Sequence, residues 1–454
     1  MTGPVDPVEG GAAVEEPVPA GRRGWAIDTT PLRNRNFRRL FFGVAATMLG
    51  QQMTLVAVPY QVYRLTGSSL LVGVTSVVAL VPLIVFGLLG GAIADAMDRR
   101  TLMLITSSGA AVTSALLAVQ ALLPGGGNLA VLWVLTACVS GFAAVNQPTR
   151  AAVIPALVGP SGVAAANALS MTVRQAGVIV GPLLAGILIG LGDLFLAYTV
   201  DAVGFLVATT LLRGLPSLSP GVVAGRLRIG AAVRGVAEGF AFLGTQPVLL
   251  MTFVVDLIAM TFGWPQAVFP ELSQTRFVES ANSLGWLFAG ASIGALVMGL
   301  SSGWVTRVDR QGAVVLAAIA VWGLAIIGFG FAPVLWLAVG CLAVAGAADM
   351  VSAVLRTSML QIAAPEEMRG RMQGVFIVVV AGGPRLGDLR AGALATATSV
   401  TVAMVSGGVV IVVAMAVVAL VVPLFWLFRA SRAEARPGSP APESGEDRPG
   451  VSGA

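Results

Sequence analysis

The sequence contains no histidine and no lysine, so all 27 of its basic residues are arginines. Without histidine the chain lacks the side chain that exchanges protons near neutral pH, so proton transfer would have to use carboxylates. Without lysine it cannot form the phosphate-binding loop of an ATP-driven pump. Nucleic-acid binding is not expected either, because the arginines are spread over short loops instead of forming one patch.

Charge and cysteine are also scarce. Only 11% of the residues are charged, whereas soluble domains carry about 25%, and 56% are hydrophobic with a mean hydropathy of +0.89. Cys138 and Cys341 lie inside apolar runs, which predicts small buried side chains and no disulfide. With no cluster of metal ligands and no nucleophile motif, we expect neither an enzyme nor a bound cofactor.

Apolar runs of about 20 residues, each long enough to cross a bilayer, recur along the whole chain. They predict an all-α membrane protein with about twelve transmembrane helices. The predicted spans are 38–60, 70–94, 101–123, 129–149, 165–190, 194–212, 247–269, 284–305, 313–332, 334–356, 372–397 and 400–428. Two six-helix bundles would then occupy residues 38–212 and 247–428.

The remaining segments are predicted to be cytoplasmic. Residues 1–37 and 429–454 are predicted to be disordered tails, and the linker 213–246 contains an amphipathic stretch from Arg228 to Leu243. Arginines gather before the first span, after the last span and in alternate loops, and the opposite side has only Arg64 and Arg276. The positive-inside rule therefore places both termini in the cytoplasm.

Two motifs occur once in each half. The hairpin from Gly91 to Arg100 has a blurred copy from Gly303 to Arg310, and the segment Asn146–Arg150 resembles Asp349–Arg356. A repeat of this length fits the duplication of a six-helix domain, so the two bundles should be pseudo-symmetric.

These motifs resemble the major facilitator superfamily over about residues 40–428. The resemblance rests on four sequence motifs: NRNFRR before the first span, DAMDRR at 95–100, PTRAAVIP at 148–155, and GVIVGP at 177–182. Within the superfamily the chain is similar to the bacterial branch of enterobactin exporters and macrolide-type efflux proteins. The resemblance implies a secondary transporter of the bacterial cytoplasmic (inner) membrane that moves a small molecule by alternating access. We expect it to be monomeric.

The hairpin residues have two interpretations. The resemblance implies that they gate the cytoplasmic side, and a plain positive-inside anchor is the alternative, although an anchor would not need the carboxylate of Asp95. The predicted gating residues are Gly91, Asp95, Asp98, Arg99, Arg100, Arg150, Arg174, Asp349 and Arg356. The second copy has Arg307 where Asp95 would stand, which puts an equal role there in doubt.

The fifth predicted span contains Gly177, Gly181, Pro182 and Gly186. Gly177 and Gly181 lie one turn apart and leave a groove for another helix, and Pro182 removes a backbone donor. The pattern resembles a signature of proton-linked exporters, although Ala185 replaces one glycine. A stripe of small residues that serves packing alone is the other interpretation.

Charges inside apolar spans are costly unless they are paired or hydrated. Asp256 and Asp201 lie deep in the seventh and sixth spans, where either could carry the coupling proton or only bind a neighbouring helix. In the eleventh span, Gly382-Gly383-Pro384 could break the helix and release Arg385, Asp388 and Arg390 into an aqueous cavity.

Arg385 and Asp388 are three residues apart and could pair along the helix. With Arg390 they could form a cationic site for an anionic, catecholate-like substrate. The alternative is an interhelical salt bridge that locks the closed state, for instance to Asp256. Asp388 is a third candidate for proton coupling, and Trp264, Trp286, Trp304 and Trp426 are predicted to anchor the chain at the membrane interfaces.

The sequence therefore predicts a secondary transporter that exports a small amphipathic molecule, siderophore-like or drug-like, in exchange for protons. Its expected partners are the substrate, protons and the lipid bilayer, and the proton gradient replaces any cofactor. Two alternatives stay open. One is a nutrient importer or facilitator of the same fold, and the other is a membrane sensor that transports nothing.

Overall fold

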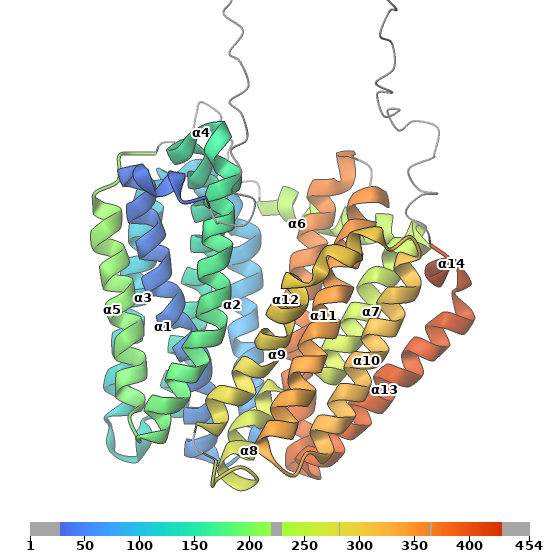
Figure 1. Cartoon of the computed structure of the whole chain (residues 1–454). Coiled ribbons are helices and arrows are strands. Elements are labelled where there is room, and N and C mark those ends of the chain that lie inside the picture. The colour runs from blue at the N-terminus through green and yellow to red at the C-terminus, as the bar shows by residue number, and fades with distance from the viewer. Residues whose placement is uncertain (1–27, 219–228, 281, 364–365, 429–454) are drawn as a thin grey trace, which may run out of the picture.

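The computed structural model describes residues 28–218, 229–280, 282–363 and 366–428, which form helices joined by short turns (Figure 1). The long helices of the first half are α1 (Arg35–Thr66), α2 (Ser69–Ala96), α3 (Arg99–Ala121), α4 (Leu129–Gly190) and α5 (Leu194–Arg213). The linker contains α6 (Ile229–Thr245). The second half contains α7 (Pro247–Gly263), α8 (Phe269–Thr275), α9 (Ser283–Leu300), α10 (Gln311–Phe331), α11 (Leu335–Ala363), α12 (Glu366–Ala397), α13 (Val400–Val421) and α14 (Pro423–Trp426).

Short polar side chains fix where most of the first-half helices begin. Asn34, Ser68, Asp98, Asn128 and Asp193 each accept a hydrogen bond from a backbone N–H in the first turn of α1 to α5. Such caps satisfy donors that the helix itself leaves unpaired. Between α1 and α2 only Gly67 and Ser68 intervene, and Gly67 has φ 62°, a conformation that glycine adopts without strain.

Ten helices among the described residues are long and apolar enough to cross a membrane. One of them, α4, has 62 residues, about 93 Å at 1.5 Å per residue, which is three times the thickness of a hydrocarbon core. Gly159 is non-helical (φ 70°, ψ 169°) and separates α4 into two spans. The 32-residue helix α12 is not among the ten, yet it is long enough to cross. With these two additions the helices match the twelve predicted spans.

The helices form two bundles, which lie side by side in Figure 1. Helices α1 to α5 pack on one another, as do α7 and α9 to α13. The main contacts between the bundles are α2 with α12 and α4 with α9. A space between the bundles is therefore bounded by these two helix pairs, and this space holds the candidate site.

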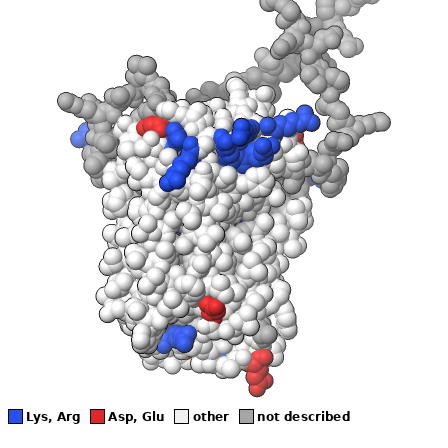
Figure 2. All heavy atoms as spheres, turned by 90° about the vertical axis from the view of Figure 1, so that its left-hand side faces the viewer, with Lys and Arg blue, Asp and Glu red and all other residues white. Residues whose placement is uncertain are grey.

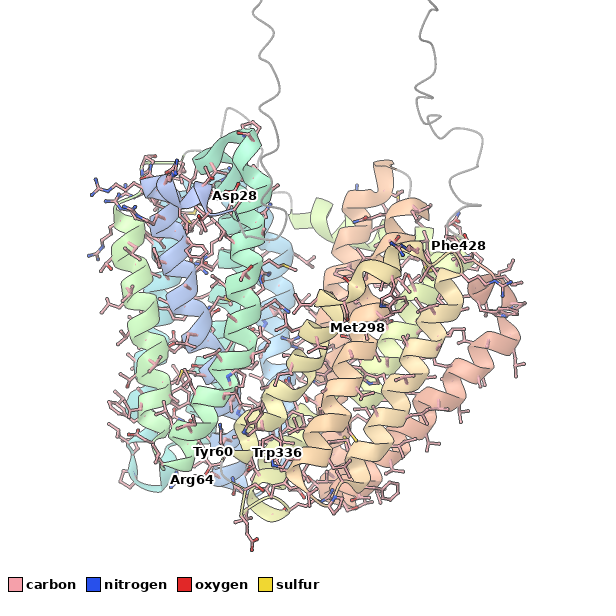
Figure 3. All side chains as sticks on the ribbon, viewed as in Figure 1. Asp28, Tyr60, Arg64, Met298, Trp336 and Phe428 are labelled. Carbon is pink, nitrogen blue, oxygen red and sulfur yellow. The ribbon has the colours of Figure 1, made fainter. Side chains whose placement is uncertain are left out.

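The two ends of the molecule differ in charge. Asp28 and Phe428, which begin and end the described chain, lie at one end, and Arg64 lies at the other (Figure 3). On the face in Figure 2 the arginines gather at the upper end, above a broad uncharged band. Large apolar side chains are exposed on the outer surfaces of the helices, among them Val112, Leu116 and Val119 on α3. This distribution fits a protein surrounded by lipid between two polar ends.

Some sequence predictions differ from the structure. The segment 150–164, predicted to be a loop, is part of α4 except at Gly159. Cys138, predicted to be buried, is exposed on α4, and Cys341 is half-buried. The predicted amphipathic stretch corresponds to α6, whereas residues 1–27, 219–228 and 429–454 of the predicted tails and linker lie outside the described residues.

Candidate transport pathway

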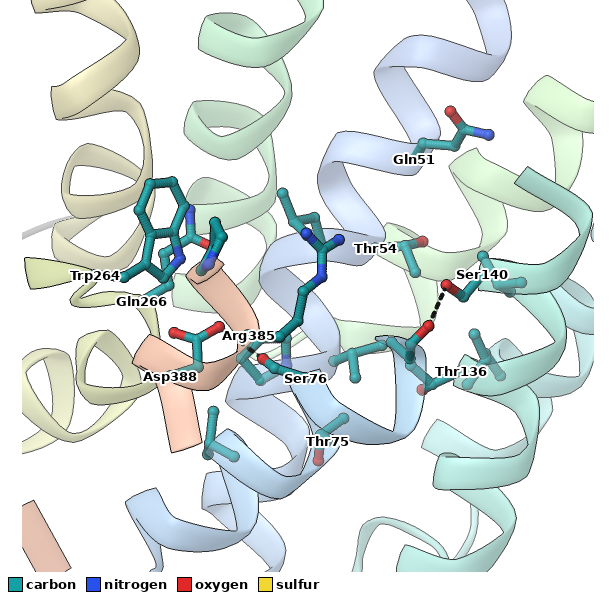
Figure 4. A pocket seen from close by; sticks show the side chains of 18 residues that line it. Gln51, Thr54, Thr75, Ser76, Thr136, Ser140, Trp264, Gln266, Arg385 and Asp388 are labelled. Carbon is teal, nitrogen blue, oxygen red and sulfur yellow. Dashed lines mark hydrogen bonds between the residues drawn. The ribbon is translucent and has the colours of Figure 1, made fainter. Parts of the chain in front are cut away.

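A cavity of about 340 Å³ lies between the two bundles (Figure 4). Its wall in the first half includes Gln51, Thr54 and Leu55 of α1, spaced so that they share one helix face, together with side chains of α2, α3 and α4. The second half contributes Trp264, Gln266, Pro384, Arg385 and Asp388. Aliphatic and aromatic groups make up most of the wall, and a few polar groups converge in it, as in sites for small molecules.

Arg385 and Asp388 bring charge into this cavity from α12. The guanidinium of Arg385 extends between Trp264 and Thr54 in Figure 4, and its Nη1 donates to the carbonyl oxygen of Ala381, 3.1 Å away. Asp388 accepts from Ser76 Oγ of the other bundle at 2.7 Å and from the backbone N–H of Ala267 at 2.9 Å. The predicted pairing of Arg385 with Asp388 is therefore not an ion pair in this structure.

Hydrogen bonds join the bundles on the side of the cavity that faces the α1–α2 turn. Ser69 Oγ donates to Glu271 Oε2 at 2.5 Å, and the backbone N–H of Leu70 donates to Thr396 Oγ1 at 3.0 Å. Asn282 Nδ2 donates to the carbonyl oxygen of Leu183 at 3.0 Å. Gly392 packs directly against Ser69, where an added Cβ would collide with its backbone. This end of the molecule is thus held closed.

A second charged group lies inside the second bundle. Arg356 Nη1 of α11 is 2.7 Å from Asp256 Oδ1 of α7, and Arg356 Nη2 is 3.9 Å from Asp349 Oδ1. Arg356 Nε also donates to Ser352 Oγ at 3.1 Å. The proposed lock between Arg385 and Asp256 is therefore wrong for this structure, because Asp256 is paired with Arg356. These three charged residues, which we call the triad, line a separate cavity of about 200 Å³.

Asp201 is fully buried in the first bundle. Its Oδ2 accepts from Thr54 Oγ1 at 2.8 Å and from Ser114 Oγ at 2.9 Å, which ties α5 to α1 and α3. Its Oδ1 has no hydrogen-bond partner. Thr54 also lines the central cavity, so one hydroxyl separates Asp201 from that cavity.

Arg390 binds backbone instead of lining the central cavity. Its guanidinium donates to the carbonyl oxygens of Phe262 (2.6 Å) and Ala403 (2.8 Å) and to Ser406 Oγ (3.1 Å). It also lies over the Phe262 ring at 5.2 Å. Arg390 thus joins α12 to α7 and α13. The predicted break at Gly382-Gly383-Pro384 is also absent, because α12 runs through Pro384 without interruption.

The predicted gating hairpin is attached to its own bundle. Asp98 begins α3 and accepts from the Thr101 N–H and hydroxyl, from Ser217 Oγ and from the Leu218 N–H. Partial burial alone would raise the pKa of Asp98, but these hydrogen bonds outweigh it and lower the pKa. Arg99 and Arg100 donate to the carbonyl oxygens of Ala152 and Arg213. Gly91 and Asp95 lie in α2, and their side-chain surroundings are outside the described part of the chain.

The other two predicted gating arginines lie on α4. Arg150 Nη1 donates to Thr47 Oγ1 of α1 at 3.2 Å, and its Nε is buried without a partner. Arg174 is exposed. Arg150 binds α1 as Arg356 binds α7, which is the relation expected of duplicated halves, but a threonine stands where the second half has Asp256.

The small residues of the predicted export motif serve two helix contacts. Gly177 faces Met48 of α1, and Gly181 faces Gln52 and Leu49 of the same helix. Gly186 instead faces Asn282 and Gly285 at the start of α9, in the other bundle. Pro182 is buried between these contacts. The stripe therefore packs inside one bundle at one end and between the bundles at the other.

Sequence reasoning missed several cavity residues. Trp264, predicted to be a membrane anchor, is instead stacked on Trp322 with ring centroids 6.3 Å apart, and it lines the central cavity. Gln51, Ser76 and Gln266 were not singled out at all. Polar residues at mid-span, such as Gln51 and Ser76, were the available signal, because an uncharged polar group in a membrane helix needs a partner or a cavity.

Comparisons with known proteins match this architecture. A family model described as transmembrane secretion effector matches residues 26–442. The enterobactin exporter EntS of Citrobacter koseri is 29% identical over 394 residues, covering 86% of this chain and 93% of that protein. EntS of Shigella boydii is 27% identical over 405 residues, covering 89% of this chain and 96% of its own.

Solved structures support the fold alone. A mutant of the nucleoside transporter NupG has a TM-score of 0.70 at 13% identity and covers 84% of this chain and 99% of its own. The peptide transporter POT in complex with sulfate has a TM-score of 0.68 at 13% identity, with 86% and 95% covered. The family match spans nearly the whole sequence, including both bundles and the cavity between them. This chain therefore belongs to the transmembrane secretion effector family, within the major facilitator superfamily of membrane transporters.

Proposed function

We propose that this transporter exports a small amphipathic, siderophore-like molecule across the bacterial cytoplasmic membrane, in exchange for protons and by alternating access. The observation that carries the proposal is the 340 Å³ cavity between the bundles, with Arg385 and Asp388 in its wall. The relatives named enterobactin exporters, which match over most of their own length, support this substrate class.

The cavity suits an aromatic molecule with acidic oxygens. Arg385 offers charge-assisted hydrogen bonds to an anionic oxygen, and the indole of Trp264 offers an apolar face beside it. Gln51, Gln266 and Ser76 add neutral polar groups. A catecholate combines these features, because it is a flat ring with two adjacent oxygens.

Asp388 is the carboxylate that we propose to carry the exchanged proton. It lines the cavity and accepts from Ser76 of the opposite bundle, so movement of the bundles would change its surroundings directly. Asp256 is already paired with Arg356, and Asp201 lies inside one bundle. Deprotonated Asp388 can accept a hydrogen bond from a substrate hydroxyl, and protonation removes that acceptor, so proton and substrate compete for the carboxylate as an exchange requires.

Alternating access follows from the asymmetry of the two ends. The bonds from Ser69, Leu70 and Asn282 hold one end closed, so substrate enters from the end that carries Asp28 and Phe428. We place this end in the cytoplasm, in keeping with its arginines. Rocking of the bundles would break these bonds and open the other end.

Everted membrane vesicles test this proposal. In vesicles with an imposed proton gradient, the protein should concentrate a catecholate siderophore in the lumen, and adding the siderophore should release protons from the lumen. Dissipating the gradient with an uncoupler should stop accumulation. Uptake that equilibrates without concentrating indicates a facilitator, and the absence of any substrate or proton movement with catecholates and drug-like amphiphiles favours the sensor.

A further inference from the structure

The cavity beside the triad has the composition of a binding subsite. Helix α11 contributes Asp349, Ala353, Arg356 and Thr357, whose spacing places them on one helix face. Helix α12 contributes Phe376, Val380 and Pro384 at four-residue intervals, and α7 contributes Asp256 and Met260. Three helices thus surround about 200 Å³ of space with both charged and apolar groups.

This cavity adjoins the central one. Trp264 and Pro384 line both cavities, so a single indole and a single ring of proline form the wall between them. At about 200 Å³ the space is below the usual range for a complete drug-sized ligand, which is about 300–1,000 Å³. It is large enough for one small group of a molecule whose main body occupies the central cavity.

The charges of the triad do not cancel. Asp256 and Arg356 form a close pair at 2.7 Å, whereas Asp349 is 3.9 Å from the same guanidinium, beyond hydrogen-bond distance. The side chain of Asp256 is 4% exposed and that of Asp349 is 35% exposed. Two carboxylates therefore share one guanidinium. Both line the cavity, and Asp349 is the more exposed of the two and the more distant from Arg356.

We infer that this subsite binds a positively charged amine group attached to an apolar body. Asp349 would accept the charge of the amine, and the rings of Trp264 and Phe376 would contact its alkyl substituents and provide cation–π attraction. The inference rests on the proposed function only in taking the chain to be an exporter of amphipathic molecules. It adds a second, cationic class of group to the anionic one assigned to Arg385.

Equilibrium dialysis of radiolabelled benzyltrimethylammonium against the purified full-length protein tests the inference. This probe is a permanent cation, so its binding cannot depend on its own protonation, and neopentylbenzene is its uncharged isostere. We expect the cation to bind and the isostere to bind at least about tenfold more weakly. Equal binding of the two compounds would overturn the inference.

Variants locate the site. Asp349→Asn should weaken cation binding by about tenfold or more, whereas the matched control Asp193→Asn, at the start of α5, should not change it. Ala353→Leu, which keeps every charge and fills the cavity, should weaken binding to a similar degree and covers the case in which Asp349→Asn fails to fold. If Asp388→Asn abolishes cation binding and both cavity variants leave it intact, the cation occupies the central cavity and the inference is wrong.

Two further outcomes distinguish this inference from proton binding at Asp349 and from the proposed function. In the first outcome, Asp349 binds a proton and not an amine. The cation then binds no better than its isostere, and Asp349→Asn changes the pH dependence of export. That result would refute the inference. Because dialysis requires no transport, cation binding without any catecholate export would refute the proposed function and leave the inference standing.

Discussion

The three aspartates buried in the bundles differ in their partners. Asp201 has two hydroxyl donors, Asp256 has a guanidinium, and Asp388 has one hydroxyl from the other bundle and one backbone N–H. Under the alternating access that we propose, a carboxylate bonded across the interface between the bundles would change its partners, whereas one bonded within a bundle would keep them. Only the structure shows this difference in partners. For this reason we rank Asp388 first among the three as the candidate for proton coupling.

The first prediction concerns Asp388. In Asp388→Asn the amide can still bind Ser76, so folding should persist, but the group can no longer exchange a proton. We expect proton-driven accumulation in everted vesicles to fall by at least about tenfold, while downhill exchange of substrate for substrate continues. Asp256→Asn is the companion variant. If it abolishes coupling and Asp388→Asn does not, the proton belongs to the triad.

Arg385 should set the affinity for acidic substrates. Arg385→Gln keeps hydrogen-bond donors but removes the charge, so the KM for a catecholate should rise by about tenfold with little change in maximal rate. Arg385→Lys keeps the charge and loses the planar guanidinium, and it should recover only part of the affinity. An unchanged KM in both variants would remove Arg385 from the substrate site.

Asp98 should matter for stability. Asp98→Ala removes a helix cap and the bonds to Ser217 and Leu218, so the free energy of unfolding should fall by about 1 kcal/mol at neutral pH. Because folding lowers the pKa of Asp98, its contribution is complete above the unfolded value of 3.8 and is lost as the pH falls through the lower folded value. Thermal unfolding of the purified protein should therefore show a difference at pH 7 that narrows below pH 3.8.

At the scale of helices, the contacts of α2 with α12 and α8 join the two bundles at one end of the molecule. Ser69 begins α2 beside Glu271 of α8 and Gly392 of α12, and Ser76 reaches Asp388 two turns further on. Small residues let the helices approach closely, and short polar bonds then hold them. Under the alternating access that we propose, this contact would break and re-form as a unit.

Cross-linking tests this element directly. In a background where Cys138 and Cys341 are serine, Ser69→Cys with Glu271→Cys places two thiols across the interface. A short bifunctional thiol reagent should join them and stop transport, and a reductant that cleaves the linkage should restore it. Each single cysteine variant treated in the same way is the control. Transport that continues after complete cross-linking would show that this end does not need to open.

Helix α12 shows where sequence reasoning failed and why. The run of Gly382, Gly383 and Pro384 predicts a break, and three charges nearby argue against an ordinary span. The helix nevertheless continues, because Arg390 and Asp388 find partners on α7, α13, α2 and the turn before α8. These partners are distant in sequence, so no local pattern could have revealed them.

At the scale of the molecule, the sequence was sufficient for the fold. Apolar runs and the repeated hairpin predicted two bundles of membrane helices, since lipid requires every span to satisfy its own backbone. The cavity was predicted only in part. Arg385 and Asp388 stood out as charges, but Trp264, Gln51 and Gln266 resemble packing residues. Only the arrangement of α1, α2, α3, α4 and α12 with the segment after α7 brings them together.

Orientation in the membrane gives the last prediction. With both termini in the cytoplasm, a cysteine at Ser68 should react with a membrane-impermeant maleimide in intact cells. A cysteine at Arg100 should react only after the cells are permeabilised. The variants belong in the cysteine-free background, and the untreated background protein is the control. The reverse pattern would invert the orientation and would turn the proposed exporter into an importer.

The turn formed by Gly67 and Ser68 has a consequence for the cell that carries this protein. Residues 191–193 and 398–399 are similarly short connections at the same end. In the proposed orientation, these parts of the chain would project little beyond the membrane on the outside. An antibody, a phage or a secreted protease would have little exposed polypeptide to bind or cleave at these turns. Any inhibitor acting from outside must therefore be small enough to follow the route of the cargo itself.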